Sequence, residues 1–227
     1  MSNYIYSEKH FNFIDKIIKN RREKFYNFIS EKVNLSNVKS YLDIGTTQNE
    51  NHPSSNYLNK KFDFIKIHNA ISDQIITDNR FSNILKKSIT SDFSKEEIEL
   101  IKSDFTISNA TIEHVGSFKN QKKMISNMIK LTRNVMVIQT VNRYFPIETH
   151  TKLPLLHFLP KKKYRKLLKF LNYEYYSLEE NLNLLSYQDM HELLNYFSNQ
   201  IKFKVYKIYT FGFVSNILAI CFINKDK

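Results

Sequence analysis

Glycine is scarce in this 227-residue chain, which has only three, at positions 45, 116 and 212. A Gly-x-Gly-x-x-Gly dinucleotide-binding turn and a Gly-x-x-x-x-Gly-Lys phosphate loop both require glycines a few residues apart. The sequence cannot form either motif. It therefore argues against nicotinamide-dependent dehydrogenases and P-loop enzymes.

Cysteine and long apolar segments are also lacking. The single cysteine, Cys221, cannot form an intrachain disulfide, and it lies in an apolar run typical of a buried strand, so we expect a core residue. The longest apolar runs, such as 217–223, are far shorter than the roughly 20 residues of a membrane span, and the amino-terminal residues lack a signal-peptide pattern. We predict a cytoplasmic protein with at most peripheral membrane contact.

Positive charge is abundant, with a formal net charge of +12. Lysine, asparagine and isoleucine are frequent throughout, which indicates a compositional bias, and the basic residues are not interleaved with aromatic ones on one strip. We therefore expect no nucleic-acid partner. The one local concentration, 161–166, precedes Leu167 and Leu168 and has two interpretations: a solvated face of a lid, or a segment lying on an anionic membrane surface.

Strand-like and helical patterns alternate after an amphipathic first helix, which we expect to be interrupted near Asn20. Further helices are predicted over 54–60, where Pro53 suits the first helical position, and after the capping-box residues Ser94 and Ser186. Strands are predicted at 40–44, 62–68, 87–90, 105–108, 135–140, 202–210 and 216–224.

This alternation predicts an α/β fold: a doubly wound, mostly parallel seven-stranded sheet with helices on both faces. The last two strands are joined by about five residues, too few for a parallel crossover, so the last strand should be antiparallel. We predict a single domain over 1–227, with an amino-terminal helical segment at 1–38. Residues 141–186, which hold three of the four prolines, should form an insertion or lid after strand five.

Ligands of open α/β sheets bind at the carboxyl ends of the strands. The first strand ends in Asp43-Ile44-Gly45-Thr46-Thr47, which offers a carboxylate, a glycine for close backbone approach, and two hydroxyls. The fourth strand leads into a loop that brings Asn109, Glu113 and His114 to the same edge. Both segments are therefore candidates for a ligand site.

The fourth-strand segment 104–116 reads Asp-Phe-x-x-Ser-Asn-Ala-x-x-Glu-His-Val-Gly. It resembles the fourth-strand motif of class I S-adenosylmethionine-dependent methyltransferases, and residues 143–157 resemble the segment after strand five in a bacterial, type 11-like subset of that family. The resemblance extends over nearly the whole chain from Ser40. It implies an enzyme that transfers a methyl group from S-adenosylmethionine to a small-molecule acceptor, with a saccharide or its lipid-linked precursor in surface-polysaccharide or glycolipid biosynthesis as the first expectation.

The resemblance also implies a set of cofactor contacts along the sheet edge. They are Asp43, Gly45, Thr46 and Thr47 after strand one, Asn69 after strand two, Asp92 after strand three and Asn109 after strand four. Asp92 would accept a hydrogen bond from the adenine amino group. Asn69 stands where an acidic residue normally holds the ribose hydroxyls, and Asp73, four residues later, is the alternative. The first loop also lacks the further glycines of the family pattern.

Methyl transfer requires mainly that the nucleophile be aligned with the methyl group. A hydroxyl acceptor would also benefit from a base, for which His114 and His150 are the candidates. Glu113 would orient a neighbour or face the acceptor, and Arg143 would hold an acidic acceptor by a bidentate contact, with His150 beside it. The spacing of His150 and His157 is a poor metal signature without nearby cysteines, so no metal is expected.

Two other functions remain open. A binding or regulatory protein that kept the fold but lost activity would explain the single glycine of the first loop. An RNA methyltransferase would explain the positive charge, although no RNA-binding module is recognisable. The acceptor atom and the oligomeric state do not follow from the sequence.

Overall fold

The computed structural model describes residues 8–48 and 56–224, with the backbone alone from 8 to 19. Helices and strands alternate along most of the chain. The helices are α1 Glu8–Lys32, α2 Tyr57–Lys61, α3 Lys95–Ile101, α4 Phe118–Leu131, α5 Lys161–Phe170, α6 Glu174–Ser177 and α7 Tyr187–Asn195, with short 3-10 helices η1 Ile112–His114 and η2 Leu156–Phe158. The strands are β1 Ser40–Ile44, β2 Ile67–Ser72, β3 Asn83–Lys86, β4 Ser103–Asn109, β5 Thr132–Val141, β6 Ile201–Thr210 and β7 Phe213–Ile223.

The strands form one seven-stranded sheet in the order β3-β2-β1-β4-β5-β7-β6. The five strands from β3 to β5 are parallel to one another, whereas β7 is antiparallel to both β5 and β6. This arrangement confirms the predicted fold class, including the antiparallel last strand. The strand order switches between β1 and β4: the chain proceeds from β1 towards one edge of the sheet through β2 and β3, and from β4 towards the other edge through β5. Ligands of open α/β sheets bind at such a switch point.

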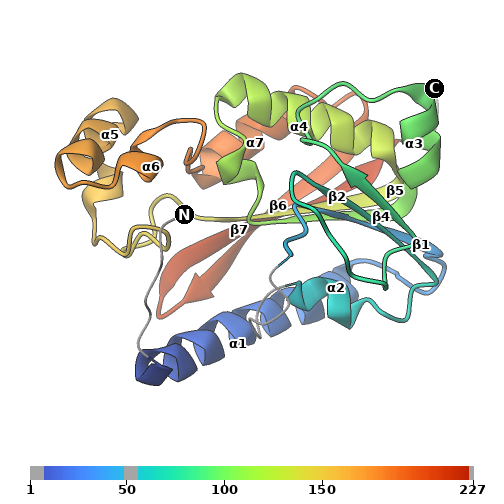
Figure 1. Ribbon diagram of the computed structural model, residues 1–227, viewed down its shortest axis with the longest axis horizontal. Helices are drawn as coiled ribbons and strands as arrows, with labels where there is room; N and C mark the ends of the chain where they lie inside the picture. Colours follow the sequence, from blue (N-terminus) through green and yellow to red (C-terminus); the bar gives the residue numbers. More distant parts are fainter. Residues whose placement is uncertain (1–7, 49–55, 225–227) are drawn as a thin grey trace.

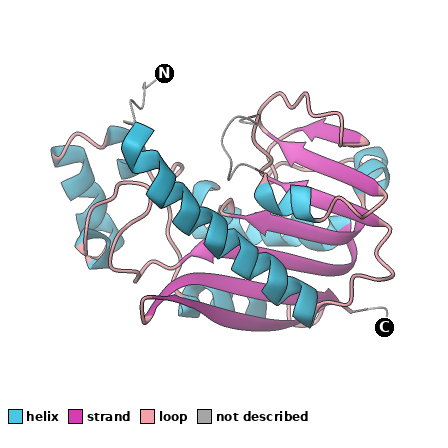
Figure 2. Cartoon of the chain, turned by 90° about the horizontal axis from the view of Figure 1, so that it is seen from below, coloured by secondary structure: helices cyan, strands magenta, loops and turns pink. Residues whose placement is uncertain are grey.

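Helices cover both faces of the sheet (Figure 1). On one face α4 and α7 pack on the sheet, with buried Met124, Met128 and Leu193 in the core. On the other face the long α1 crosses the strands beside the short α2 (Figure 2), and Phe25, Ile29 and other apolar residues are buried there. The predicted capping boxes at Ser94 and Ser186 are confirmed.

Several local predictions were wrong. The first helix runs through Asn20 without interruption. The predicted second strand, 62–68, is mostly a turn after α2, and β2 instead continues to Ser72. The third strand, β3, ends at Lys86, just before the predicted 87–90. Pro53 and the start of the predicted helix at 54 lie outside the described residues.

The segment between β5 and α7 leaves the sheet and contains η2, α5 and α6, which lie together at one end of the molecule (Figure 1). Cys221 in β7 is fully buried, which confirms it as a core residue. Within the described ranges, none of the helices combines the length and apolar character needed to cross a bilayer.

Candidate functional site

A cavity of about 330 Å³ opens at the carboxyl edge of the parallel strands. Its volume is within the range of small-molecule sites. The lining residues come from the loops after β1, β2, β3 and β4: Ile44, Gly45, Thr47, Ile71, Ser72, Asp73, Gln74, Lys87, Ser88, Ile89, Thr90, Ala110, Thr111, His114 and Val115. The lining combines apolar side chains with hydroxyl, amide and charged groups, a combination found in small-molecule sites.

The first loop approaches the fourth-strand loop closely at Gly45. Its φ of +85° lies in the left-handed region, and its amide donates to the carbonyl of Ile71 at 2.9 Å. A Cβ atom at this position would lie 2.2 Å from Oγ1 of Thr111, which itself donates to the carbonyl of Ile44 at 3.1 Å. No side chain fits here without displacing Thr111. The glycine therefore allows the two loops to meet under the cavity.

Asp43 and Thr46 lie beneath this loop rather than on the cavity wall. Both are buried, and the Thr46 hydroxyl donates to Oδ2 of Asp43 at 2.8 Å. Burial raises the pKa of Asp43 to about 6, although the Thr46 hydrogen bond opposes that rise. Thr47 and Gly45 do line the cavity. The structure thus divides the predicted first-loop contacts into two lining and two supporting residues.

The end of β2 is four residues later than predicted, and this changes the residue at the cavity. Asn69 lies in the middle of the strand and is 2% exposed; its amide nitrogen donates to Ser103 Oγ at 3.0 Å and to the carbonyl of Ile101 at 3.2 Å. It does not reach the cavity. Asp73, the residue after β2, is exposed and lines it. The alternative carboxylate is therefore the one placed at the ligand edge.

Asp92 also lies away from the cavity. Its side chain is 90% exposed and forms an ion pair with Lys123 of α4. The cavity is lined instead by the four residues directly after β3, including Ser88 and Thr90, whose hydroxyls are 2.9 Å apart. After the fourth strand, the lining residues are Ala110 and Thr111, whereas Asn109, the last residue of β4, does not line the cavity. Ala110 adopts a positive φ of 55° there.

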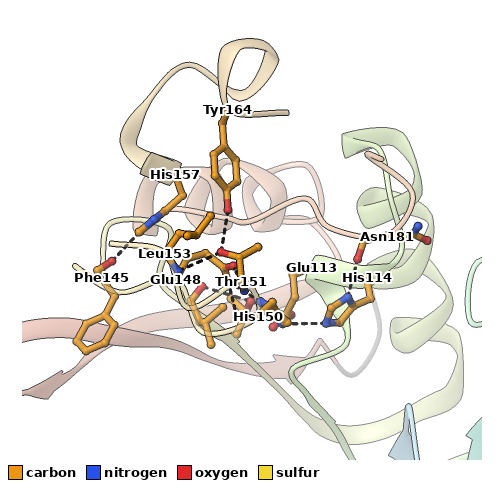
Figure 3. A network of polar contacts seen from close by, with 12 residues as sticks. Glu113, His114, Phe145, Glu148, His150, Thr151, Leu153, His157, Tyr164 and Asn181 are labelled. Atoms are coloured by element: carbon orange, nitrogen blue, oxygen red, sulfur yellow. Dashed lines mark hydrogen bonds and ion pairs between the residues drawn. The ribbon is translucent and has the colours of Figure 1, made fainter. Parts of the chain in front are cut away.

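A second polar group adjoins the cavity, centred on two histidines (Figure 3). His114 belongs to η1, and His150 belongs to the insertion, yet their Nε2 atoms are 3.1 Å apart. His114 Nδ1 is 2.7 Å from the carbonyl oxygen of Asn181, and His150 Nδ1 is 2.6 Å from Oε1 of Glu148. The fold therefore joins the two predicted bases through their imidazole rings.

Two buried glutamates flank the histidines. Glu148 accepts from the backbone amides of His150 at 2.8 Å and Thr151 at 2.6 Å. Burial is the largest single influence on both groups and disfavours their charged forms. The hydrogen bonds to Glu148 and the attraction between the two charges together outweigh it, so the pKa of His150 is raised and that of Glu148 is lowered to about 2. Glu113 is 0% exposed; its Oε2 accepts from Thr140 at 2.9 Å, and its Oε1 has no hydrogen-bond partner.

The insertion is fastened to this edge by its own polar contacts. Asn183 donates from its backbone amide to the carbonyl of Glu113 at 2.7 Å and from its side chain to the carbonyl of Gly116, also at 2.7 Å. Arg143 donates to the carbonyls of His157 and Leu159, at 3.3 and 2.8 Å. The Arg143 guanidinium thus ties the start of the insertion to residues 157–159 within it. His157 donates to the carbonyl of Phe145 at 2.6 Å, away from the histidine pair.

Several of these residues are absent from the sequence predictions. Glu148 lies within the segment 143–157 that the resemblance covers, and its position two residues before His150 is the only sequence signal for it. Thr140, Asn181 and Lys87 carry no signal, because only the folded chain brings them to the edge.

Comparisons by sequence find no match, either to a protein-family model or to a curated protein. Solved structures do match. N-methyltransferase NodS from Bradyrhizobium japonicum WM9 has a TM-score of 0.54 at 10% identity, over 93% of this chain and 99% of that one. The magnesium protoporphyrin IX methyltransferase ChlM from Synechocystis PCC 6803, with bound SAM, has a TM-score of 0.51 at 8% identity, over 99% of this chain and 86% of that one.

A third structure, described as a putative Zn-dependent alcohol dehydrogenase from Rhodobacter sphaeroides, has a TM-score of 0.54 at 12% identity, over 84% of this chain and 87% of that one. At such identities the likeness concerns the fold. The chain has the Rossmann-like, seven-stranded fold that NodS and ChlM share.

Proposed function

We propose that this protein transfers a methyl group from S-adenosylmethionine to a small-molecule acceptor. The observation that carries the proposal is the cavity at the carboxyl ends of β1 to β4, in a fold shared with methyltransferases of which ChlM was solved with bound SAM. NodS was likewise solved with S-adenosyl-L-homocysteine, at a TM-score of 0.51 and 10% identity. The bacterial, type 11-like kinship rests on the sequence segments 104–116 and 143–157 alone.

The residues around the cavity fit such a cofactor. Gly45 and Thr47 would face its methionine part, with Thr46 and Asp43 supporting the loop from below. Asp73 takes over from Asn69 the role of binding the ribose hydroxyls, because it is the carboxylate after β2 that lines the cavity. An ionised carboxylate offers two oxygens that accept from hydroxyl donors.

The adenine ring would lie between apolar walls that include Ile71, Ile89 and Val115. We assign its polar contacts to Ser88 and Thr90 in place of Asp92, whose carboxylate is paired with Lys123 outside the cavity. Asn109 remains the candidate that closes the site from β4. Because its neighbour Ala110 lines the cavity, Asn109 would do so by holding the backbone of Ala110 in position.

The acceptor would enter on the side of His114, which belongs both to the cavity wall and to the histidine pair. When bound, the cofactor supplies an electrophilic methyl group on a positively charged sulfur. The residues of this chain would align the acceptor oxygen with that group, and an imidazole Nε2 would take the proton that the hydroxyl loses. Glu113 would orient this pair from its buried position beside His114.

We further propose a hydroxyl-bearing acceptor such as a saccharide. The support is the polar, imidazole-containing edge together with the resemblance of segment 143–157. Because the Arg143 guanidinium is already engaged by two carbonyls, it offers an acidic acceptor only its remaining donors. A lid role for residues 141–186 is part of this proposal, and the contact of Asn183 with the carbonyl of Gly116 supports it.

Thermal unfolding with added ligands tests the proposal. Saturation at about a hundred times the dissociation constant adds about 2.7 kcal/mol, which raises Tm by about 5–10 °C for a domain of this size. We expect S-adenosylmethionine and S-adenosylhomocysteine to raise Tm and NAD to leave it unchanged. No rise with either adenosyl ligand at millimolar concentration would refute the proposal.

The second candidate is a binding protein with this fold but without turnover. The first loop favours it, because Gly45 is followed by Thr46 and Thr47 instead of further glycines. Its signature is a Tm rise with S-adenosylhomocysteine combined with no methylation of any hydroxyl, amine or carboxylate acceptor in a panel using isotope-labelled S-adenosylmethionine.

A further inference from the structure

The two imidazoles of His114 and His150 face each other in an arrangement that needs a positive charge between them. The Nδ1 of His114 faces a carbonyl oxygen of Asn181, and the Nδ1 of His150 faces a carboxylate oxygen of Glu148. Both partners can only accept, so both Nδ1 atoms carry hydrogen. In the neutral rings both Nε2 atoms then carry lone pairs, and these two atoms are 3.1 Å apart. A cation or an extra proton must occupy this space.

The distance suits a metal ion. Two imidazole nitrogens bound to one zinc ion at about 2.0–2.1 Å, at angles between octahedral and tetrahedral, lie about 2.8–3.4 Å apart. The Nε2–Nε2 separation of 3.1 Å falls within this interval. The two histidines are 36 positions apart in sequence, so only the folded insertion creates this pair.

Glu113 offers a third ligand. A carboxylate oxygen of Glu113 and one nitrogen each of His114 and His150 all lie within 4.8 Å of one another. The carboxylate is fully buried, and its Oε1 has no hydrogen-bond partner, which leaves a charged acceptor unsatisfied. A shift on the order of 1 Å would bring this oxygen to the distance that ligands of one ion share.

Each ligand also has a partner that fixes its orientation. Metal-bound histidines almost always donate their other ring nitrogen to a carboxylate or a carbonyl. Glu148 does this for His150, and the carbonyl of Asn181 does it for His114 (Figure 3). Thr140 donates to the other oxygen of Glu113 at 2.9 Å. All three candidate ligands are thus held by neighbours before any ion binds.

We propose that Glu113, His114 and His150 bind one divalent transition-metal ion, the histidines through Nε2 and the glutamate through its unpartnered oxygen. Two histidines and one carboxylate form a three-ligand site that leaves coordination positions free for water or a ligand. The prediction of no metal was based on the spacing of His150 and His157. In the structure His150 lies next to His114, whereas His157 contacts the carbonyl of Phe145.

The ion would lie beside the cavity, because His114 lines the cavity and is also one of the three proposed ligands. This part of the inference rests on the proposed function and deepens it: the ion would hold the acceptor through a hydroxyl oxygen and lower the pKa of that hydroxyl, as a bound divalent metal does for water. The imidazoles would then act as ligands instead of as the base, and solvent water would take the proton that the hydroxyl loses.

A metal titration tests the proposal directly. The untagged protein is treated with EDTA, dialysed, and titrated with Zn²⁺, Mn²⁺ and Mg²⁺ in a calorimeter, with Co²⁺ absorption as an independent readout. We expect one Zn²⁺ per chain, weaker binding of Mn²⁺, and the weakest binding of Mg²⁺, which prefers oxygen ligands. His114→Ala, His150→Ala and Glu113→Gln should each weaken Zn²⁺ binding by about 100-fold or more, and Glu148→Gln by about 10–100-fold.

The matched control is His191→Ala, since His191 is an exposed histidine on α7 and should leave Zn²⁺ binding unchanged. Circular dichroism confirms that each variant is folded, and Glu113→Gln keeps the side-chain volume if an alanine variant does not fold. Absence of stoichiometric Zn²⁺ binding, or equal binding by the His114, His150 and His191 variants, would overturn the proposal and assign the space between the rings to a proton. Affinity for S-adenosylhomocysteine, measured on the same samples, separates this failure from failure of the proposed function.

Discussion

The close contact at Gly45 gives a sharp quantitative prediction. In Gly45→Ala the new Cβ would meet Thr111 Oγ1 at 2.2 Å and Cγ2 at 2.9 Å, and the backbone would keep a φ near +85°. An alanine in the left-handed region costs about 1–2 kcal/mol, and forcing an extra carbon into a packed position costs about 1–3 kcal/mol more. We therefore expect Gly45→Ala to lower the free energy of unfolding by about 2–5 kcal/mol.

The chain offers a control for the backbone part of this cost. Gly212, in the turn between β6 and β7, has a similar φ of +78°, but a Cβ there would meet no atom within 4 Å. Gly212→Ala should thus lose only about 1–2 kcal/mol. The difference between the two variants measures the contact with Thr111.

A double-mutant cycle isolates that contact further. Thr111→Ala removes the two closest atoms, so Gly45→Ala should cost about 1–3 kcal/mol less in the Thr111→Ala background than in the wild type. Urea denaturation of the four proteins gives these free energies. Equal losses for Gly45→Ala and Gly212→Ala, or strict additivity in the cycle, would refute the reasoning.

Three further predictions concern residues around the site. Burial raises the pKa of Asp43 from 3.8 to about 6, so the folded chain binds the carboxyl proton of Asp43 more tightly than the unfolded chain does. The free energy of unfolding should therefore fall by about 3 kcal/mol as the pH rises from 4 to 7. Asp43→Asn, which cannot ionise, should gain stability relative to wild type between pH 4 and pH 7; a constant difference in urea denaturation would contradict this. Asp92→Asn should leave affinity for S-adenosylhomocysteine within about 2-fold in calorimetry, as its ion pair with Lys123 is exposed, and a 10-fold loss would restore the adenine contact that the sequence predicts. Ser186→Ala should lower the free energy of unfolding by about 1 kcal/mol in urea, because it removes the helix cap of α7, and an unchanged midpoint would show that the cap contributes nothing.

The sequence predicted the central and carboxyl-terminal strands better than those at the other edge. β1, β4, β5, β6 and β7 are long or fully buried runs, so their apolar pattern is clear. In contrast, β3 has four residues at the sheet edge, and none of them is fully buried. The apolar residues Phe62 and Ile65 belong to a turn that packs on the core, which gives it a strand-like pattern without a strand.

These shifts explain which of the predicted residues line the cavity. Gly45 and Thr47 follow a strand whose end was predicted to the residue, and both line the cavity. Asn69 and Asp92 were assigned from strand ends that were several residues in error, and neither reaches it. The link between His114 and His150 depends on how the insertion folds back through Asn181 and Asn183, and no local pattern encodes that.

The most direct test of a cofactor site at the carboxyl edge is calorimetric titration of S-adenosylhomocysteine into Asp73→Asn, with Asp63→Asn as the matched control. Asp63 is an exposed aspartate before β2, outside the cavity, whereas Asp73 lines the cavity directly after β2. We predict one site in the wild type, unchanged affinity in Asp63→Asn and a loss of about 10-fold or more in Asp73→Asn. Equal affinities in all three proteins would contradict the assignment of Asp73, and no binding to the wild type would contradict the cofactor site itself.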